Sequence, residues 1–293
     1  MTKTAWVFPG QGSQAVGMGV DLLDTAIAQE RYRQAEAILG WSVPERCAAD
    51  LETLSRTLYT QPCLYTISAV IADLLRAQGQ RPDVLAGHSL GEYAALYAAG
   101  VFTFEAGLRL VQYRAELMEQ ASGGKMVALM GFDREALEAA VHDTADVVLA
   151  NDNHADQVVI SGSPAAVDAV LAQIKVKRAV PLKVSGAFHS PLMVPAALEF
   201  NEVLESVEFQ PAQFPVIANV DPTPSCEASV LKERLMKQMT GPVRWREIGL
   251  TFTQMGIETV VEVGPGKVLT GLVKRTCPSV QLLNKGTLAD LAV

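Results

Sequence analysis

Apolar residues occur along this chain in two arrangements, as short continuous runs and as longer stretches with helical spacing. A continuous run predicts a strand buried on both faces, whereas apolar residues that recur every three or four positions predict a helix with one buried face. Outside the middle of the chain, the predicted strands are residues 4–8, 83–86, 215–219 and 259–263. The predicted helices are residues 21–49 (with breaks near Gly40 and Pro44), 60–77 (with Pro62 at an early position), 92–100, 104–121, 228–239 and 268–275.

The pattern changes at residue 125 to a shorter alternation of strands and helices. Strands are predicted at 126–132, 147–150, 157–161 and 179–184, helices at 134–144 and 164–175, and a polar loop at 151–154. The order β-α-β-β-α-β is that of a ferredoxin-like unit. We therefore expect an α/β fold with two parts. An α/β-hydrolase-like large domain with a parallel sheet would comprise residues 1–124 and 189–293, and an inserted ferredoxin-like small domain would comprise residues 125–188. The substrate would bind in the cleft between them.

The composition argues against several classes of protein. With 293 residues, 24 Lys+Arg, 32 Asp+Glu and a net charge of −8, the chain is not expected to bind nucleic acid or a membrane through bulk charge. Its 4 cysteines have no C-x-x-C spacing, which predicts neither a zinc site nor a disulfide framework and favours a reducing, cytoplasmic setting. No apolar stretch reaches the length of a membrane-spanning helix, and the first apolar run is too short for a signal peptide.

The strand predicted at 83–86 leads into Gly-His-Ser-Leu-Gly at residues 87–91, and a helix is predicted to follow. A serine at the centre of G-x-S-x-G between a strand and a helix is typical of a nucleophile elbow, in which the glycines relieve backbone crowding. The helix N-terminus then favours negative charge that develops near Ser89. The alternative is a helix-capping serine that happens to lie between two glycines.

A serine nucleophile needs a base, and His189 is the best candidate among the 4 histidines. It lies at the predicted return from the small domain to the large one, and an imidazole titrates near neutral pH. His88 adjoins the serine in the chain and is therefore poorly placed to act as its base. The alternative for His189 is a buried histidine at the domain junction that only satisfies its hydrogen bonds.

Arg114 lies on the apolar stripe of the helix predicted at 104–121, and an arginine on a buried face must be paired. It would either form a salt bridge inside the fold or hold a substrate carboxylate in the cleft. Gln61 is either a polar residue near a helix cap or a site residue. The loop at 10–14 lacks the third glycine of a dinucleotide fingerprint, with Ala15 in its place, but it could lend a backbone N–H to the serine turn.

Six motifs in this order resemble those of malonyl-CoA:acyl carrier protein transacylases, along nearly the whole chain. They are FPGQGSQ at residues 8–14, TQP at 60–62, GHSLGEY at 87–93, VQYR at 111–114, FHSPLM at 188–193 and EVGPGKVL at 262–269. The resemblance implies that Ser89 is the nucleophile, that His189 is its base, and that the amides of Gln11 and Leu90 form an oxyanion hole. It further implies that the backbone carbonyl of Gln238 orients the histidine, and that the substrate-binding residues include Arg114, Gln61, Asn153, Phe188 and His88.

Two departures from the bacterial pattern bear on these roles. The loop that begins at Asn153 reads Asn-His-Ala-Asp where the bacterial enzymes usually carry Asn-Ser-Pro-Gly, which weakens the match at Asn153. The pair before the histidine is Ala187-Phe188, which resembles malonyl-selective acyltransferase domains of polyketide synthases. There, Phe188 would crowd an α-methyl branch, and Leu90 also agrees with malonyl.

The resemblance implies a two-step transfer of malonyl from malonyl-CoA to the phosphopantetheine thiol of acyl carrier protein, through malonyl-serine and without a metal or other cofactor. It suggests a cytoplasmic monomer that supplies fatty acid synthesis. The acidic carrier would meet a basic face formed by Lys175, Lys177, Arg178 and Lys183, or by Lys267, Lys274 and Arg275. Three alternatives stay open: a serine hydrolase, a non-catalytic docking subunit, and the same transfer to a polyketide, polyunsaturated-lipid or malonate decarboxylase carrier.

Overall fold

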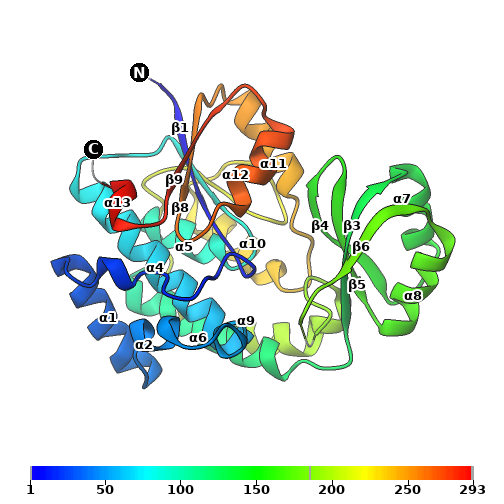
Figure 1. The fold of residues 1–293 in the computed structure, drawn as a ribbon, viewed down its shortest axis with the longest axis horizontal. Helices are drawn as coiled ribbons and strands as arrows, with labels where there is room; N and C mark the ends of the chain where they lie inside the picture. Colours follow the sequence, from blue (N-terminus) through cyan, green and yellow to red (C-terminus); the bar gives the residue numbers. More distant parts are fainter. Residues whose placement is uncertain (1, 185, 292–293) are drawn as a thin grey trace.

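The computed structural model describes residues 2–184 and 186–291, which form a mixed α/β protein with two separate sheets (Figure 1). Within these residues, the strands are β1 (Thr4–Phe8), β2 (Val84–Gly87), β3 (Lys125–Phe132), β4 (Val147–His154), β5 (Gln157–Gly162), β6 (Val176–Pro181), β7 (Val216–Ile217), β8 (Thr259–Val263) and β9 (Gln281–Lys285). The α-helices are α1 (Ala26–Leu39), α2 (Val43–Ala48), α3 (Leu51–Leu54), α4 (Thr57–Ala77), α5 (Gly91–Ala98), α6 (Phe104–Gln120), α7 (Arg134–His142), α8 (Pro164–Gln173), α9 (Val194–Ser206), α10 (Ala228–Gln238), α11 (Trp245–Gln254), α12 (Val268–Thr276) and α13 (Leu288–Leu291).

The first sheet is parallel, has the order β7-β2-β1-β8-β9 in the described residues, and carries helices on both faces. Because side chains alternate along a strand, β1 contributes to two cores. Ala5 and Val7 lie in a core with residues of α11 and α12, whereas Trp6 and Phe8 lie in the larger core with residues of α4, α5 and α6. This explains why β1 is apolar from Ala5 to Phe8, as we expected for a strand buried on both faces.

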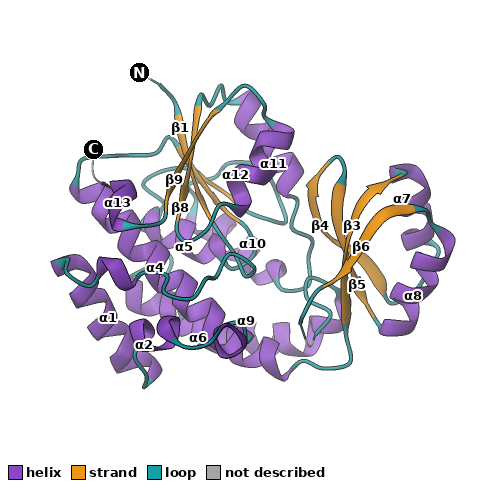
Figure 2. Ribbon diagram, in the orientation of Figure 1, coloured by secondary structure: helices purple, strands orange, loops and turns teal. Residues whose placement is uncertain are grey.

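The second sheet is antiparallel, with the order β4-β5-β3-β6 among the described residues. Helices α7 and α8 cover one face of it, and their apolar residues share a core with those of β3, β4 and β5 (Figure 2). The predicted α/β class and the β-α-β-β-α-β order are therefore confirmed. All of these elements fall within the segment 125–188 that we expect to form the small domain, and its exact boundaries stay a prediction.

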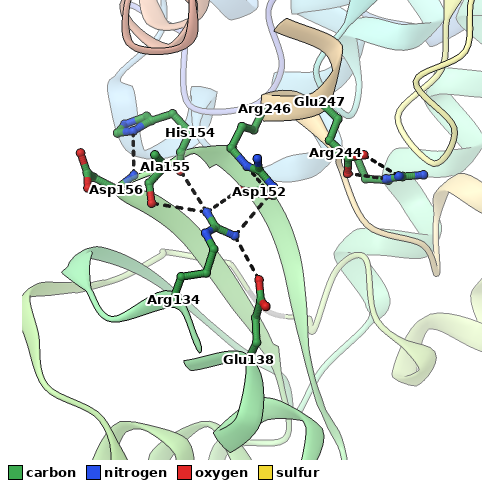
Figure 3. A network of polar contacts seen from close by, with 9 residues as sticks. All are labelled: Arg134, Glu138, Asp152, His154, Ala155, Asp156, Arg244, Arg246 and Glu247. Atoms are coloured by element: carbon green, nitrogen blue, oxygen red, sulfur yellow. Dashed lines mark hydrogen bonds and ion pairs between the residues drawn. The ribbon is translucent and has the colours of Figure 1, made fainter. Parts of the chain in front are cut away.

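Asp152 of β4 joins the two parts of the molecule (Figure 3). Its Oδ1 accepts a hydrogen bond from Arg134 Nη2 of α7 at 3.0 Å, and its Oδ2 accepts one from Arg246 Nε of α11 at 2.8 Å. Its backbone N–H also donates to the carbonyl of Val243, at 2.9 Å. One carboxylate thus links the antiparallel sheet to a helix that covers the parallel sheet.

The prediction of a loop at 151–154 is wrong, because β4 continues to His154. The strand stays paired with β5 as far as His154 opposite Gln157, although the register shifts twice along it. Its polar side chains are there because Asp152 forms ion pairs and Asn151 and Asn153 line a cavity, not because the backbone forms a loop. Polarity alone therefore misled the sequence analysis at this strand.

Several predicted boundaries are also wrong. The last strand of the antiparallel sheet is 176–181 instead of 179–184, since it is an edge strand with mostly exposed residues and no clear apolar run. Helix α4 begins at Thr57, so Pro62 lies inside the helix and not in its first turn. Residues 21–49 form two main helices that are separated, as expected, at Gly40, whose φ of 75° ends α1. The strand predicted at 215–219 shortens to β7, and the sequence analysis missed β9, α9 and α11.

No helix in residues 2–184 and 186–291 combines the length and apolarity needed to cross a membrane. The same part of the chain contains no group of three or more His, Cys, Asp or Glu side chains placed to hold a metal ion.

Candidate active site

Ser89 stands in a tight turn between β2 and α5, and its backbone has a positive φ of 52°. The turn is so close to its neighbours that side chains on the flanking glycines would clash with backbone. A Cβ on Gly87 would lie 1.9 Å from the carbonyl carbon of Gly91, and one on Gly91 would lie 2.0 Å from the carbonyl oxygen of Phe8. The G-x-S-x-G sequence thus forms the strained strand-to-helix turn that the pattern predicts.

The side chain of His189 meets that of Ser89, with Nε2 2.8 Å from the serine Oγ. Its Nδ1 lies 2.9 Å from the carbonyl of Gln238 and 3.1 Å from that of Gly241. Because carbonyl oxygens only accept hydrogen bonds, Nδ1 must carry the proton, and Nε2 is left to accept the proton of the serine hydroxyl. His189 also has a positive φ, of 59°, which shows that the chain is bent sharply where it returns to the large sheet.

Arg114 is completely buried and contacts the same serine. Its Nη2 donates to Ser89 Oγ at 3.1 Å and to Gln238 Oε1 at 3.2 Å, and its Nη1 donates to Gln61 Oε1 at 2.8 Å. In the described part of the chain its guanidinium has no carboxylate within ion-pair distance, and its Nε has no hydrogen-bond partner. The site therefore holds a buried cation whose direct partners are neutral oxygens.

Gln238, the last residue of α10, contacts nearly every other group of the site and is itself fully buried. Besides its carbonyl contact with His189 and its Oε1 contact with Arg114, its Nε2 donates to the carbonyl oxygen of Ser89 at 2.9 Å. One residue thus fixes the histidine, the arginine and the serine backbone relative to one another.

The loop after β1 approaches the serine turn closely, since a Cβ on Gly10 would lie 2.4 Å from the carbonyl oxygen of His88. The side chain of Gln11 is held outside the turn by Thr57, to which its Nε2 donates at 3.1 Å. In residues 2–184 and 186–291, neither the backbone N–H of Gln11 nor that of Leu90 donates to a protein acceptor. Both amides are therefore available to an oxygen atom bound at the turn.

A cavity of about 280 Å³ opens beside Ser89 between the two sheets. The predicted site residues Gln61, His88, Asn153 and Phe188 line it, together with residues of β3, β5 and α12. Arg114 is not among the lining residues and reaches the cavity only through its partners Gln61 and Ser89. His88 points away from its neighbour Ser89, because its Nε2 lies 2.9 Å from Asn153 Oδ1 and its ring packs beside Trp245.

Two buried polar residues of this site were missed by the sequence analysis. Glu92 is the second residue of α5, and its Oε2 accepts hydrogen bonds from the Asn219 backbone N–H at 2.9 Å and from Gln238 Nε2 at 3.0 Å. The side chain of Asn219 in turn contacts the backbone of Ser89. A glutamate inside the otherwise apolar start of α5 and an asparagine after an apolar run were the available signals.

Burial controls the protonation of the site. Burial, with the nearby Arg114 charge, lowers the pKa of His189 to about 3, so that the ring is neutral near pH 7. Burial also lowers the pKa of His88. The pKa of the Glu92 carboxyl is raised to about 7 by burial, although its hydrogen bonds to Gln238 and Asn219 and the charge of Arg114 act in the opposite direction.

The fold and the site define the class of the protein. The chain belongs to the acyl transferase domain family, whose model matches residues 5–291. A malonyl CoA-acyl carrier protein transacylase from Synechocystis sp. is 60% identical over 289 residues, which are 99% of both chains. The crystal structure of the malonyl-CoA:ACP transacylase from Synechocystis sp. has a TM-score of 0.97 to this chain, with 99% of both chains covered.

Two further relatives extend the comparison. A malonyl-transacylase in complex with a type II PKS acyl-carrier protein is 38% identical, with a TM-score of 0.93 over 99% of this chain and 98% of that one. A polyketide biosynthesis malonyl CoA-acyl carrier protein transacylase from Bacillus subtilis is 41% identical over 92% of this chain and 96% of its own. The likeness thus extends along more than nine-tenths of the chain in each case.

Proposed function

We propose that this protein is an acyl-carrier-protein S-malonyltransferase, which moves malonyl from malonyl-CoA to the phosphopantetheine thiol of acyl carrier protein. The observation that carries the proposal is the buried Arg114 beside Ser89, without a carboxylate partner in the described residues. A buried cation is costly unless it is paired, so the site favours an acyl group that brings its own carboxylate. Malonyl carries a carboxylate, whereas acetyl and longer saturated acyl groups do not.

In the first half-reaction, Ser89 Oγ attacks the thioester carbonyl carbon while its proton moves to His189 Nε2. The tetrahedral oxyanion would be held by the N–H groups of Gln11 and Leu90, which the described residues leave without an acceptor. The C–S bond then breaks, the thiolate of CoA takes the proton from His189, and malonyl-Ser89 remains. The carbonyl oxygens of Gln238 and Gly241 at Nδ1 support this role, because they keep the histidine in the required tautomer.

In the second half-reaction, the phosphopantetheine thiol of the carrier gives its proton to His189 Nε2 and attacks malonyl-Ser89. The bond from Ser89 Oγ to the acyl carbon breaks, and the serine regains its proton from His189. The malonyl carboxylate would pair with Arg114 throughout, in place of the neutral oxygens of Gln61 and Ser89. Phe188 in the cavity wall would limit a branch at C2 of the acyl group, and His88 and Asn153 would shape the opposite wall.

A serine hydrolase is the second candidate, and two observations argue against it. The Nδ1 atom of His189 faces two backbone carbonyls, whereas hydrolases of the elbow type place a carboxylate there. The acyl site also contains the Arg114 cation, which an apolar acyl chain would leave unpaired. The carrier can belong to fatty acid or to polyketide synthesis, since relatives with and without a polyketide name resemble the chain closely. The 60% identity to the Synechocystis transacylase, whose name mentions no polyketide, favours the first of these.

The proposed setting is the cytoplasm, which the free thiols of all 4 cysteines support. The proposed working form is a monomer, because one chain supplies every residue of the site. An acidic carrier would dock on exposed basic residues near the cavity, for which α12, with Lys274 and Arg275 in its last turn, is the first candidate.

Whole-protein mass spectrometry after brief incubation with malonyl-CoA tests the proposal. The wild type should gain one malonyl group and lose it when holo carrier protein is added, with malonyl appearing on the carrier. Ser89→Ala should gain none, and Arg114→Ala should gain far less. An adduct that decays to free malonate whether or not carrier is present would instead establish a hydrolase.

A further inference from the structure

The side chain of Asn219 lies against the turn that carries Ser89. Asn219 follows β7 in the chain and is fully buried. Its Oδ1 accepts a hydrogen bond from the Ser89 backbone N–H at 2.7 Å, and its Nδ2 donates to the carbonyl oxygen of Gly87 at 2.5 Å. A single carboxamide thus bridges the residue before the turn and the residue at its centre.

The two hydrogen bonds of Asn219 stabilise the backbone of the turn. A non-glycine residue with a φ of 52° is strained, and it keeps this conformation only when its surroundings hold it there. The turn also removes the Gly87 carbonyl and the Ser89 N–H from regular pairing in a buried place, where an unpaired polar group is costly. The side-chain carboxamide of Asn219 is planar and pairs with both the Gly87 carbonyl and the Ser89 N–H. It therefore fixes the distance between these two groups, and with it the direction of the serine side chain.

The carbonyl oxygen of Ser89 is held from the other side by Gln238 Nε2, at 2.9 Å. The two residues whose carboxamides bind the serine backbone come from different elements, and each also donates a hydrogen bond to the same oxygen atom. Glu92 Oε2 accepts the backbone N–H of Asn219 and the Nε2 of Gln238. Glu92 therefore fixes the position of Asn219, which binds the serine N–H, relative to Gln238, which contacts His189 and Arg114.

We propose that Asn219 is a positioning residue that holds Ser89 for attack, and that Glu92 aligns Asn219 with Gln238. The reaction in which Ser89 acts rests on the proposed function, but the positioning of its hydroxyl does not depend on the acyl group. Asn219 contacts no reacting atom, since its hydrogen bonds go to the backbone of Gly87 and Ser89. It also occupies the Ser89 N–H, so that the oxyanion must be held by other amides.

The test compares Asn219→Ala with Ile217→Ala, which removes a fully buried side chain from the same segment and leaves the polar contacts intact. Two rate constants are measured on the folded fraction, acylation of Ser89 by malonyl-CoA and labelling of Ser89 by a fluorophosphonate. Asn219→Ala should lower both by about 100-fold relative to Ile217→Ala, because a displacement of about 1 Å has that effect. The KM for malonyl-CoA should change little, since Arg114 keeps its contacts. Rates for the two variants within about threefold of each other would overturn the proposal.

A second pair of variants keeps the test decisive if Asn219→Ala does not fold. The double variant N219D/E92Q carries one buried carboxylate, as the wild type does, and still accepts the Ser89 N–H, but it cannot donate to Gly87. It should label about tenfold more slowly than Glu92→Gln alone, which keeps an acceptor oxygen for both of its donors and leaves Asn219 able to donate to Gly87. Equal labelling of N219D/E92Q and Glu92→Gln would contradict the inference. If the wild type takes the fluorophosphonate but no malonyl, the proposed function fails while the role of Asn219 is still measured.

Discussion

Arg114 donates a hydrogen bond through Nη2 to the Oγ of Ser89, at 3.1 Å. The same oxygen lies 2.8 Å from the Nε2 of His189, which carries no proton. The serine hydroxyl therefore donates a hydrogen bond to the neutral His189 ring and accepts one from the Arg114 cation. Before any substrate is bound, the guanidinium already favours the alkoxide character that attack requires. Under the proposed function, the arginine would therefore serve both the serine nucleophile and the acyl carboxylate.

Arg114→Ala should lower malonyl transfer by about 30-fold to several thousand-fold, the equivalent of the 2–5 kcal/mol lost when a buried charge pair loses one partner. Acylation by acetyl-CoA should fall much less, so that the preference for malonyl over acetyl decreases. Rapid-quench mass spectrometry with each thioester measures both rates. Arg109→Ala is the matched control, because Arg109 is exposed on the same helix, and it should leave both rates unchanged. An equal loss with both thioesters would mean that Arg114 serves only the serine.

The acylation rate should show no protonation step of His189 near pH 6.5. A base must be neutral to act, and the pKa of His189 is lowered to about 3, so protonation of the ring should reduce the rate only in strong acid. Glu92, with its pKa raised to about 7, is the group of the site that titrates near neutrality. Single-turnover acylation by malonyl-CoA, measured from pH 5.5 to 8 in the wild type and in Glu92→Gln, provides the check. An inflection near pH 6.5 that persists in Glu92→Gln would show that His189 titrates like a free imidazole.

Phe188→Ala should relax selection against a branched acyl group. Phe188 is buried in the wall of the cavity that adjoins Ser89, and removing its ring makes room for a methyl group at C2. The ratio of acylation by methylmalonyl-CoA to acylation by malonyl-CoA should rise by about tenfold or more, the usual range for one methyl group in a pocket. Competition between the two thioesters, read by adduct mass, measures the ratio. Val268→Ala changes an exposed residue of the same cavity and should leave it unchanged.

Asp152→Ala should destabilise the protein by about 1–3 kcal/mol, because it leaves Arg134 and Arg246 without their shared partner in a partly buried place. The free energy of unfolding in urea is the measurement, and a double-mutant cycle with Arg246→Ala isolates the contact between the two parts of the molecule. Asp168→Ala removes an exposed ion pair with Lys125 and should change stability by less than about 0.5 kcal/mol. Equal effects of the two aspartate variants would show that Asp152 does not join the two parts.

The elements that could be predicted from the sequence are those whose signal is local. The strand 4–8 is apolar after Thr4, and the glycines at 87 and 91 indicate a turn that leaves no room for a Cβ at those positions. The predicted boundaries are wrong for elements whose side chains contact residues far away in the sequence. Strand β4 was cut short at Ala150, because the polar residues after it serve Arg246 and His88, which are far away in the sequence. The edge strand β6 was shifted for a related reason, since its exposed residues show no apolar period.

The sequence by itself determined the α/β class, the serine turn and the set of candidate site residues. The signals for these are local, because strand burial, tight turns and motifs each depend on residues that are close together in the sequence. Only the tertiary structure decided what these groups do to one another. It brought His189 within 2.8 Å of a serine 100 positions earlier and left Arg114 beside that serine without a carboxylate in the described residues. It also gave contacts in the site to Asn219, which lies outside all six motifs, and to Glu92, which lies in GHSLGEY but had no predicted role there. Their effect depends on hydrogen bonds shorter than about 3 Å between separate elements, and such distances are fixed by packing and not by the order of residues.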